Sequence, residues 1–408
     1  MREYHVRDFG AVGDGKTMNT ESIQHTIDLC YENGGGKVVI GSGTYLSGSI
    51  CLKSGVNLHI EHDGVLLGSP DWRDYPEKTD LKHVDSSGLP RNRNASFIFA
   101  EECDNISITG TGKIDANGKN FVYLNENGKY ARIDAPTPPR VVFFAGCSNV
   151  LIEDVTMVNQ PAGWSYWIHD CDYVSFDKCK VLAELQYPNN DGIHINSSRN
   201  VTISNCVIST GDDSIVVRAN NRSLKEPKIC EKVAVTNCIL TSYANGIRIG
   251  WRNDGVIQNC VFSNITMTDT NVGIGIVLPY AKYAPVDRGT EPTKIRNLKF
   301  SNIVMDEIYA HPIVIEIDDD AETLCDSVSD ISFNNISSRG LEFPYVHGRK
   351  ENIVKNISFS NCRFEKVKDD VYPNYESHGY AKGQRKKDAE IIQNAKNIVF
   401  DNTCFSDL

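Results

Sequence analysis

Short alternating segments recur through the last two thirds of the chain. Each copy has a polar residue, often Asn, followed by two apolar residues at alternate positions and usually a closing Asn or Asp, as in 149–154 and 200–205. Further copies begin at Asn105, Tyr173, Lys232, Asn259, Asn297, Asp330, Asn356 and Asn397. The two-residue period is that of a β-strand, and no helical pattern separates the copies. Steps of 24 to 44 residues between copies predict the coils of an all-β fold, a parallel β-helix.

The repeat also predicts stacks of equivalent side chains. We expect the recurring Asn to form an internal ladder that satisfies turn amides from coil to coil. Cys206, Cys238 and Cys362 follow three copies, and Cys179 is in register with them, which predicts a small buried stack. The chain has 13 cysteines and no CxxC pair, so metal and redox motifs are weak and reduced thiols are expected.

A second set of strands recurs in step with the first, at 192–196, 214–218, 246–250, 273–277 and 312–316. In each of these strands, two aliphatic residues at alternate positions are expected to face the core, so the residues between them share the opposite face. That face is the candidate binding site, and it carries His194, Asn196, Arg218, Arg248 and Glu316. Trp164, Tyr166, Trp167 and Trp251 lie next to it in sequence, and sugar rings stack on such side chains.

The two ends of the chain read differently. A helix is predicted from an N-cap at Asn19 or Thr20 to Cys30, where it would cover the open end of the solenoid. Residues 10–17 match the P-loop pattern, but the segment before them alternates polar and apolar residues, so a tight glycine turn is expected. We predict a single domain over residues 1–408, with 1–70 as N-terminal cap and first coils and 366–408 as C-terminal loop and last coil. Within the latter, 369–387 reads as a loop insertion.

Composition narrows the function further. The net charge is −11, which argues against nucleic-acid or anionic-membrane binding. No run of 18 apolar residues exists, and residues 1–6 lack the apolar region of a signal peptide. A cytoplasmic location is therefore expected, or a secreted one if a signal was removed, and the oligomeric state is left open.

Acidic residues occupy equivalent positions in consecutive strands of the second set. Asp191, Asp213 and Asn245 each lie two residues before the first aliphatic residue, and Asp212 adjoins Asp213. In stacked coils these positions form a column, with carboxylates about 5 Å apart. Crowded carboxylates repel, so one holds a proton while another stays ionised. Glycoside hydrolysis needs this pairing of acid and base, although Asp and Asn also favour plain solvated turns.

Several motifs resemble those of glycoside hydrolase family 28, the polygalacturonase family, over about residues 4 to 365. Residues 8–15 and 43–48 resemble its N-terminal signatures, 189–192 (Asn-Asn-Asp-Gly) stand where the family has Asn-Thr-Asp-Gly, and 211–213 match its Asp-Asp motif. The resemblance implies a right-handed parallel β-helix with a short N-terminal capping helix and inverting hydrolysis without a cofactor. It also implies that Asp212 is the general acid and that Asp191 and Asp213 hold and deprotonate the water.

Two departures from the family pattern bear on the substrate. Residues 244–246 (Ala-Asn-Gly) replace Gly-His-Gly, and 275–277 (Gly-Ile-Val) replace the Arg-Ile-Lys that grips a uronate on the leaving-group side. The acidic run 318–320 would repel a uronate. We therefore expect exo-action on a pectin-type oligosaccharide with a neutral leaving sugar, rhamnose first. The expected substrate-binding residues are His194, Arg218, Asn245, Arg248, Trp251, Trp167 and Asp319.

Three alternatives stay open at this point. The first is a galacturonidase or polygalacturonase proper. The second is a pectate-lyase-type β-helix with calcium on Asp191, Asp212 and Asp213. The third is a β-helix that binds carbohydrate without turning it over.

Overall fold

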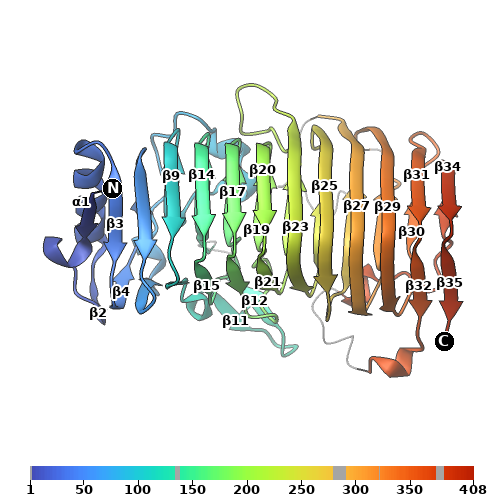
Figure 1. Cartoon of the computed structure of the whole chain (residues 1–408), viewed down its shortest axis with the longest axis horizontal. Coiled ribbons are helices and arrows are strands. Elements are labelled where there is room, and N and C mark those ends of the chain that lie inside the picture. Colours follow the sequence, from blue (N-terminus) through green and yellow to red (C-terminus); the bar gives the residue numbers. More distant parts are fainter. Residues whose placement is uncertain (1, 134–137, 279–290, 321, 374–380) are drawn as a thin grey trace.

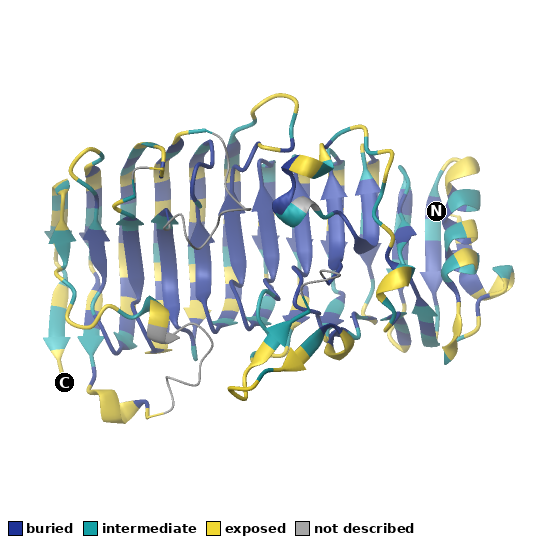
Figure 2. Ribbon diagram, turned by 180° about the vertical axis from the view of Figure 1, so that it is seen from behind, coloured by how far each residue is buried: buried dark blue, intermediate teal, exposed yellow. Residues whose placement is uncertain are grey.

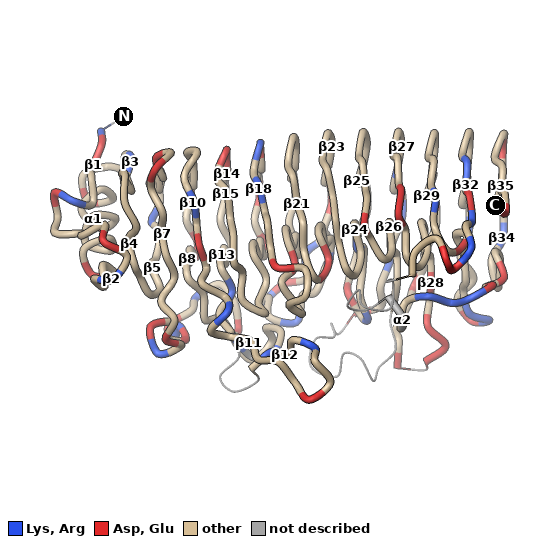
Figure 3. The backbone as a smooth tube through the Cα atoms, turned by 90° about the horizontal axis from the view of Figure 1, so that it is seen from below, with Lys and Arg blue, Asp and Glu red and all other residues tan. Residues whose placement is uncertain are grey.

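The computed structural model describes residues 2–133, 138–278, 291–320, 322–373 and 381–408, and in it parallel strands stack into coils along one axis (Figure 1). The strands form a right-handed parallel β-helix, as expected. Of the described strands, 22 belong to one sheet and 11 to a second, and a third sheet is a two-stranded antiparallel hairpin. Figure 3 shows the longer loops on one side of the solenoid, around that hairpin.

The larger sheet forms two sides of the coils. Its strands are β1 (Glu3–His5), β2 (Asp14–Met18), β3 (Gly36–Ile40), β4 (Gly43–Ser47), β6 (Val56–Ile60), β7 (Gly64–Gly68), β9 (Asp104–Thr109), β10 (Lys113–Asp115), β14 (Ser148–Glu153), β15 (Thr156–Val158), β17 (Asp172–Asp177), β18 (Lys180–Leu182), β20 (Arg199–Ser204), β21 (Val207–Thr210), β23 (Cys230–Ser242), β25 (Val256–Met267), β27 (Thr293–Ile308), β29 (Cys325–Gly340), β31 (Val354–Ser360), β32 (Arg363–Lys366), β34 (Ala395–Asp401) and β35 (Cys404–Asp407).

The smaller sheet carries the second set of strands predicted from the sequence. Its strands are β5 (Ile50–Cys51), β8 (Ser96–Glu101), β13 (Arg140–Ala145), β16 (Tyr166–His169), β19 (Ile193–Asn196), β22 (Ile215–Arg218), β24 (Asn245–Ile249), β26 (Val272–Leu278), β28 (Ile313–Ile317), β30 (Tyr345–His347) and β33 (Ile392–Gln393). The hairpin pairs β11 (Val122–Leu124) with β12 (Tyr130–Arg132). The 3₁₀ turns are Val6–Phe9, Trp72–Asp74, Ser86–Gly88, Pro90–Asn92, Gly118–Phe121 and Asp369–Val371.

The core runs the length of the solenoid between the sheets, and Figure 2 shows the strands in the middle of the solenoid coloured as buried over much of their length. The rings of Phe262, Phe300, Phe333 and Phe359 stack from coil to coil with centroids 4.8 to 4.9 Å apart, which is the spacing of paired strands. The predicted stack of buried thiols is confirmed for Cys179, Cys206 and Cys238. Cys362 lies in the same column four coils beyond Cys238, after Ile265, Ile303 and Ile336.

The residue that begins each repeat adopts a left-handed backbone conformation, with φ between 53° and 57° in all ten copies. Asn tolerates this conformation better than most residues, which explains its recurrence at this corner. The ladder forms, since Asn297 donates to Asn259 at 2.7 Å and Asn397 donates to Asn356 at 2.9 Å. However, these side chains are exposed, so the prediction of an internal ladder is wrong. The corner directs the side chain away from the core, where it bonds only to its neighbours.

Both ends agree with the sequence pattern. Helix α1 (Thr20–Glu32) packs Ile23, Ile27 and Cys30 into the core at the N-terminal end. Residues 14–18 are strand β2, separate from that helix, so the 10–17 motif does not form a strand–loop–helix phosphate site. At the other end, the predicted loop insertion contains helix α2 (Ala381–Gln384), and its residues 374–380 lie outside the described ones.

One connection crosses the outward face of the smaller sheet. Residues 69–95, here called the roof segment, join β7 to β8 and carry three of the 3₁₀ turns. Val84 and Leu89 of this segment pack in an apolar cluster with Phe99, Phe143 and Trp167, which lie in register on β8, β13 and β16. The roof segment therefore covers that face of the sheet on the N-terminal side of β19.

Candidate active site

Asp191, Asp212 and Asp213, here called the acid cluster, lie at the start of β19 and β22. Pairing of Ile193 with Ile215, and of Ile215 with Ile247, places Asp191, Asp213 and Asn245 in one column, as predicted. One carboxylate oxygen from each Asp of the cluster lies within 4.8 Å of one oxygen of each of the other two. Asp191, Asp212 and Asp213 are 5%, 9% and 8% exposed. Two hydrogen bonds of about 2.7 Å span such a distance, so a single water can bridge two of these carboxylates.

Two carboxyls of the cluster have raised pKa values. Burial, together with the charges of Asp212 and Asp213, raises the pKa of Asp191 well above its usual range. Its Oδ1 is buried and has no protein hydrogen-bond partner among the described residues. The pKa of Asp213 is also raised by burial, although Arg248 and a hydrogen bond from Asn245 oppose the change. Both shifts favour the protonated form of the carboxyl concerned.

Asp212 is held as a hydrogen-bond acceptor. Its Oδ2 accepts from the backbone N and from Nδ2 of Asn189, both at 3.1 Å, and its Oδ1 accepts from the backbone N of Asp213 at 3.0 Å. Such bonds favour the ionised form. For Asp212 to act as the acid, the proton must move to it from Asp191 when the site fills.

Asn245 extends the column by one coil and orients Asp213. It donates from its backbone N at 3.0 Å and from Nδ2 at 2.5 Å, both to Oδ1 of Asp213. In the next coil, a Cβ on Gly275 would lie 2.5 Å from Oδ1 of Asn245. No side chain fits at 275 while Asn245 holds Asp213, so the loss of a basic residue there and the presence of Asn245 belong together.

Arg248 is a buried cation, and within the part of the chain that the structure describes no carboxylate lies at salt-bridge distance from it. Its guanidinium lies 4.4 Å from the ring centroid of Trp251 and donates to the backbone O of Gly250 and of Val277, both at 3.3 Å. The residue is 8% exposed, and burial lowers its pKa. Asp213 and Asp212 act on it electrostatically from the neighbouring turns. Arg248 and Trp251 thus contact each other beside the acid cluster, and both are candidate substrate-binding residues.

Arg218 has a counter-ion that sequence reasoning missed. Its Nε and Nη2 donate to the carboxylate of Asp254 at 3.0 and 2.8 Å, and both side chains are buried. Asp254 lies in the turn after β24, a coil away from Arg218, so sequence spacing carried no signal for this pair. Because this bidentate pair neutralises its charge, Arg218 is less suited than Arg248 to binding a substrate carboxylate.

A small pocket adjoins the cluster through His194. Its walls include Trp164, Trp167, His194 and Arg218. Nδ1 of His194 lies 3.8 Å from Oδ2 of Asp191, and burial with Arg218 and Arg140 nearby pushes the pKa of His194 well below its usual range. The imidazole is therefore neutral. Trp167 stacks on Phe143 at 4.2 Å and is 1% exposed, so only its edge toward the pocket can meet a sugar.

Two loops close this pocket. The roof segment contributes Gly88 and Pro90 to its lining, and residues 219–229 between β22 and β23, here called the second roof loop, contribute Asn220 and Ser223. A Cβ on Gly88 would lie 2.4 Å from the backbone O of Arg222, so only glycine allows the two loops to meet so closely. The outward-facing side chains of His194, Asn196 and Arg218 leave the core as predicted and line the pocket under these loops. Glu316, further along the sheet, is half-buried and bonds instead to Tyr345 and Lys386.

The remaining candidates fall elsewhere or in the core. Asp319 is exposed in the segment after β28, in contrast to the buried cluster. Tyr166 points into the core, where its ring meets Phe176 at 5.2 Å.

Comparisons with known proteins agree with this arrangement. Residues 78–362 match the model of the glycosyl hydrolases family 28. The chain is 27% identical over 378 residues to an exopolygalacturonase of Arabidopsis thaliana, covering 90% of this chain and 74% of that protein. Its fold is similar to that of a hyperthermoactive exopolygalacturonase from Thermotoga maritima, with a TM-score of 0.72, 21% identity and coverage of 98% and 92% of the two chains.

The same fold also occurs in a protein of a different kind. PfbA, a surface adhesin of Streptococcus pneumoniae, superposes with a TM-score of 0.64 at 17% identity, covering 100% of this chain and 92% of the adhesin. The β-helix alone therefore does not determine activity, which depends on the residues of the site.

Proposed function

The chain belongs to glycosyl hydrolase family 28 and is a glycoside hydrolase, and we propose that it removes single galacturonate units from the ends of pectin-type oligosaccharides with inversion of configuration. The observation that carries the proposal is the position of the acid cluster, beside a pocket that the two roof loops close.

The roof loops support exo-action. On the N-terminal side of the pocket, the outward face of β8, β13 and β16 is buried under the roof segment, so a further sugar has no surface there. A chain would therefore enter with its end in the pocket. The Arabidopsis relative is named as an exopolygalacturonase, in keeping with this mode.

We assign the chemical roles as follows. Asp212 protonates the leaving oxygen, and Asp191 and Asp213 hold the attacking water and accept its proton. Because burial and the neighbouring charges raise the pKa of Asp191, a proton held there can pass to Asp212 within the 4.8 Å span of the cluster. The three carboxylates titrate as a unit, so the proton belongs to the cluster and not to one fixed residue.

The spacing of the acids does not by itself indicate inversion. Inverting enzymes usually keep acid and base about 6.5 to 9.5 Å apart, whereas the nearest oxygens of this cluster lie within 4.8 Å. The stereochemical assignment rests on the family, and it is open to direct measurement.

Arg248 supports a uronate as the bound sugar. Its charge is buried beside the cluster, no described residue supplies it with a carboxylate partner, and a substrate carboxylate would do so. A neutral leaving sugar such as rhamnose is the second candidate, because Gly275 and Val277 offer no cation on β26. Cytoplasmic action on imported oligosaccharides stays a prediction. Among the described residues, the structure contains no helix long and apolar enough to span a membrane.

A product screen tests the proposal. Digalacturonate, trigalacturonate, polygalacturonate and a rhamnose-containing pectic oligosaccharide are each incubated with the enzyme and with the Asp212→Asn variant as control. Release of monogalacturonate as the first product, with little fall in polymer viscosity, is the expected result. Rapid loss of viscosity would contradict exo-action, and cleavage of the rhamnose-containing substrate alone would favour the second candidate. An unsaturated product that requires calcium would indicate lyase chemistry instead.

A further inference from the structure

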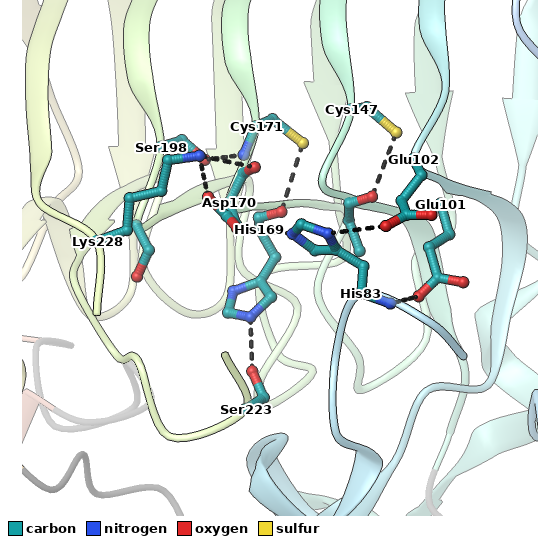
Figure 4. A network of polar contacts seen from close by, with 12 residues as sticks. His83, Glu101, Glu102, Cys147, His169, Asp170, Cys171, Ser198, Ser223 and Lys228 are labelled. Atoms are coloured by element: carbon teal, nitrogen blue, oxygen red, sulfur yellow. Dashed lines mark hydrogen bonds and ion pairs between the residues drawn. The ribbon is translucent and has the colours of Figure 1, made fainter. Parts of the chain in front are cut away.

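The two roof loops are fastened to one side chain. Asp170 follows β16 and is 11% exposed. Its Oδ2 lies 2.6 Å from Nε2 of His83 in the roof segment, and its Oδ1 pairs with Nζ of Lys228 in the second roof loop (Figure 4). We propose that Asp170 is a positioning residue that keeps the pocket closed by clasping both loops, and that His83 makes this clasp sensitive to pH. The inference rests on the proposed function only for its effect on substrate.

The clasp lies beside the pocket wall. His169, the neighbour of Asp170, lines the pocket and bonds through Nε2 to Oγ of Ser223 at 2.7 Å. Ser223 in turn accepts from the backbone N of Asp85 at 2.8 Å, and Val84 forms an antiparallel bridge with Leu224. The two loops therefore hold each other as well as Asp170. Releasing either loop from the carboxylate weakens the hold on the other.

His83 is surrounded by acceptors. Besides Asp170, Glu102 places Oε1 3.5 Å from Nδ1 of the ring, and Glu101 accepts from the backbone N of His83 at 2.8 Å (Figure 4). An imidazolium can donate from both ring nitrogens, whereas the neutral ring can donate from only one. The ring lies against the backbone at Gly146, where a Cβ would come within 2.6 Å of it. The other charged and titratable neighbours of the clasp are Lys228 and His169, and His169 is kept neutral because burial lowers its pKa to about 3.

The direction of the pH effect follows from these contacts. The hydrogen bond to Asp170, reinforced by Glu102, raises the pKa of His83 although burial opposes the change. An opened loop would return the ring to the ordinary value of about 6.5. The charged form thus stabilises the closed pocket fully below about pH 6.5, and this contribution is lost as the pH rises through the raised pKa.

Hydrogen exchange tests the clasp without any substrate. Protection of the amides of Asp85 and Gly88, corrected for intrinsic exchange rates, is compared at pH 5.5 and pH 8.5 in the wild-type protein and in His83→Gln. Asp85 donates to Ser223 and Gly88 donates to Asp85, so both amides report the docked roof. We expect wild-type protection to fall about three- to tenfold between the two pH values, and His83→Gln to be low and nearly constant. Asp170→Asn should lower protection at both values, and His5→Gln, an exposed histidine at the N-terminal end, should match the wild-type.

Kinetics then links the clasp to the reaction. The KM for trigalacturonate should be about three- to tenfold higher in His83→Gln than in the wild-type at pH 5.5, and the two should converge at pH 8.5, with kcat changed less. Equal protection and equal KM in His83→Gln and wild-type at every pH would overturn the proposal, and so would a ratio that does not vary with pH. If no galacturonide is cleaved, the proposed function fails, and hydrogen exchange still decides the clasp.

Discussion

Replacing Asp191 by Asn should stabilise the protein while abolishing its activity. Asp191 is buried against two other carboxylates, and its Oδ1 lacks a protein partner among the described residues. In the unfolded chain this carboxyl ionises with a pKa of about 3.9, whereas the folded protein holds the proton to a higher pH. The wild-type stability therefore falls as the pH rises from about 4 toward the raised pKa, and Asn removes this dependence.

The size of the gain has an upper limit. A carboxyl that keeps its proton in the fold costs at most about 1.4 kcal/mol per pH unit above 3.9, which is about 1.5 kcal/mol at pH 5 and about 4 kcal/mol at pH 7. For 408 residues, the entropy of unfolding makes 1 kcal/mol equivalent to about 1 °C in Tm. The Tm of Asp191→Asn should thus exceed that of the wild-type by up to about 2 °C at pH 5 and up to about 5 °C at pH 7.

Thermal unfolding followed by circular dichroism at pH 4, 5, 6 and 7 measures this difference, with Asp212→Asn as the matched control. Asp212 accepts three hydrogen bonds, two from Asn189 and one from Asp213, so its replacement should lose about 1 to 2 kcal/mol of bonding and show no comparable gain. A Tm for Asp191→Asn that is lower than wild-type, or an increase independent of pH, would refute the reasoning that Asp191 carries the proton.

Four further outcomes are expected. Asp212→Asn and Asp213→Asn should each lower kcat by at least about 10²-fold with circular dichroism unchanged, and near-normal turnover in either would remove the proposed acid or base. Proton NMR of the first product should show the anomeric configuration opposite to that of the cleaved bond, and retention would rule out the assigned roles. Arg248→Met should lower kcat/KM for galacturonate oligomers about 10- to 100-fold, with a smaller effect on a substrate whose bound sugars are neutral, and equal losses on both would show a structural role. Activity should survive dialysis against EDTA, whereas loss that calcium restores would favour a lyase-type site on the acid cluster.

The sequence was sufficient to predict the architecture and the column of functional positions. A strict period of two at regular intervals specifies strands, and stacking of coils leaves equivalent positions one strand spacing apart. The alignment of Asp191, Asp213 and Asn245 in one column could therefore be predicted from the strand register, and the structure confirms this alignment. The capping helix could also be predicted from the sequence, because its N-cap and its apolar spacing lie within one continuous segment.

What the sequence could not determine depends on connections between coils. The alternation placed Arg218 and Arg248 on one outward face. Only the fold pairs Arg218 with Asp254, whereas none of the described carboxylates pairs with Arg248. The roof segment has no periodic pattern, since its path is set by contacts with loops more than 100 residues away, such as that of Val84 with Leu224. The sequence by itself determined which residues face outward from each strand. Tertiary structure decided which of them stay exposed, are neutralised or enclose a pocket, because burial and pairing arise from segments that are distant along the chain and meet only when the coils have stacked.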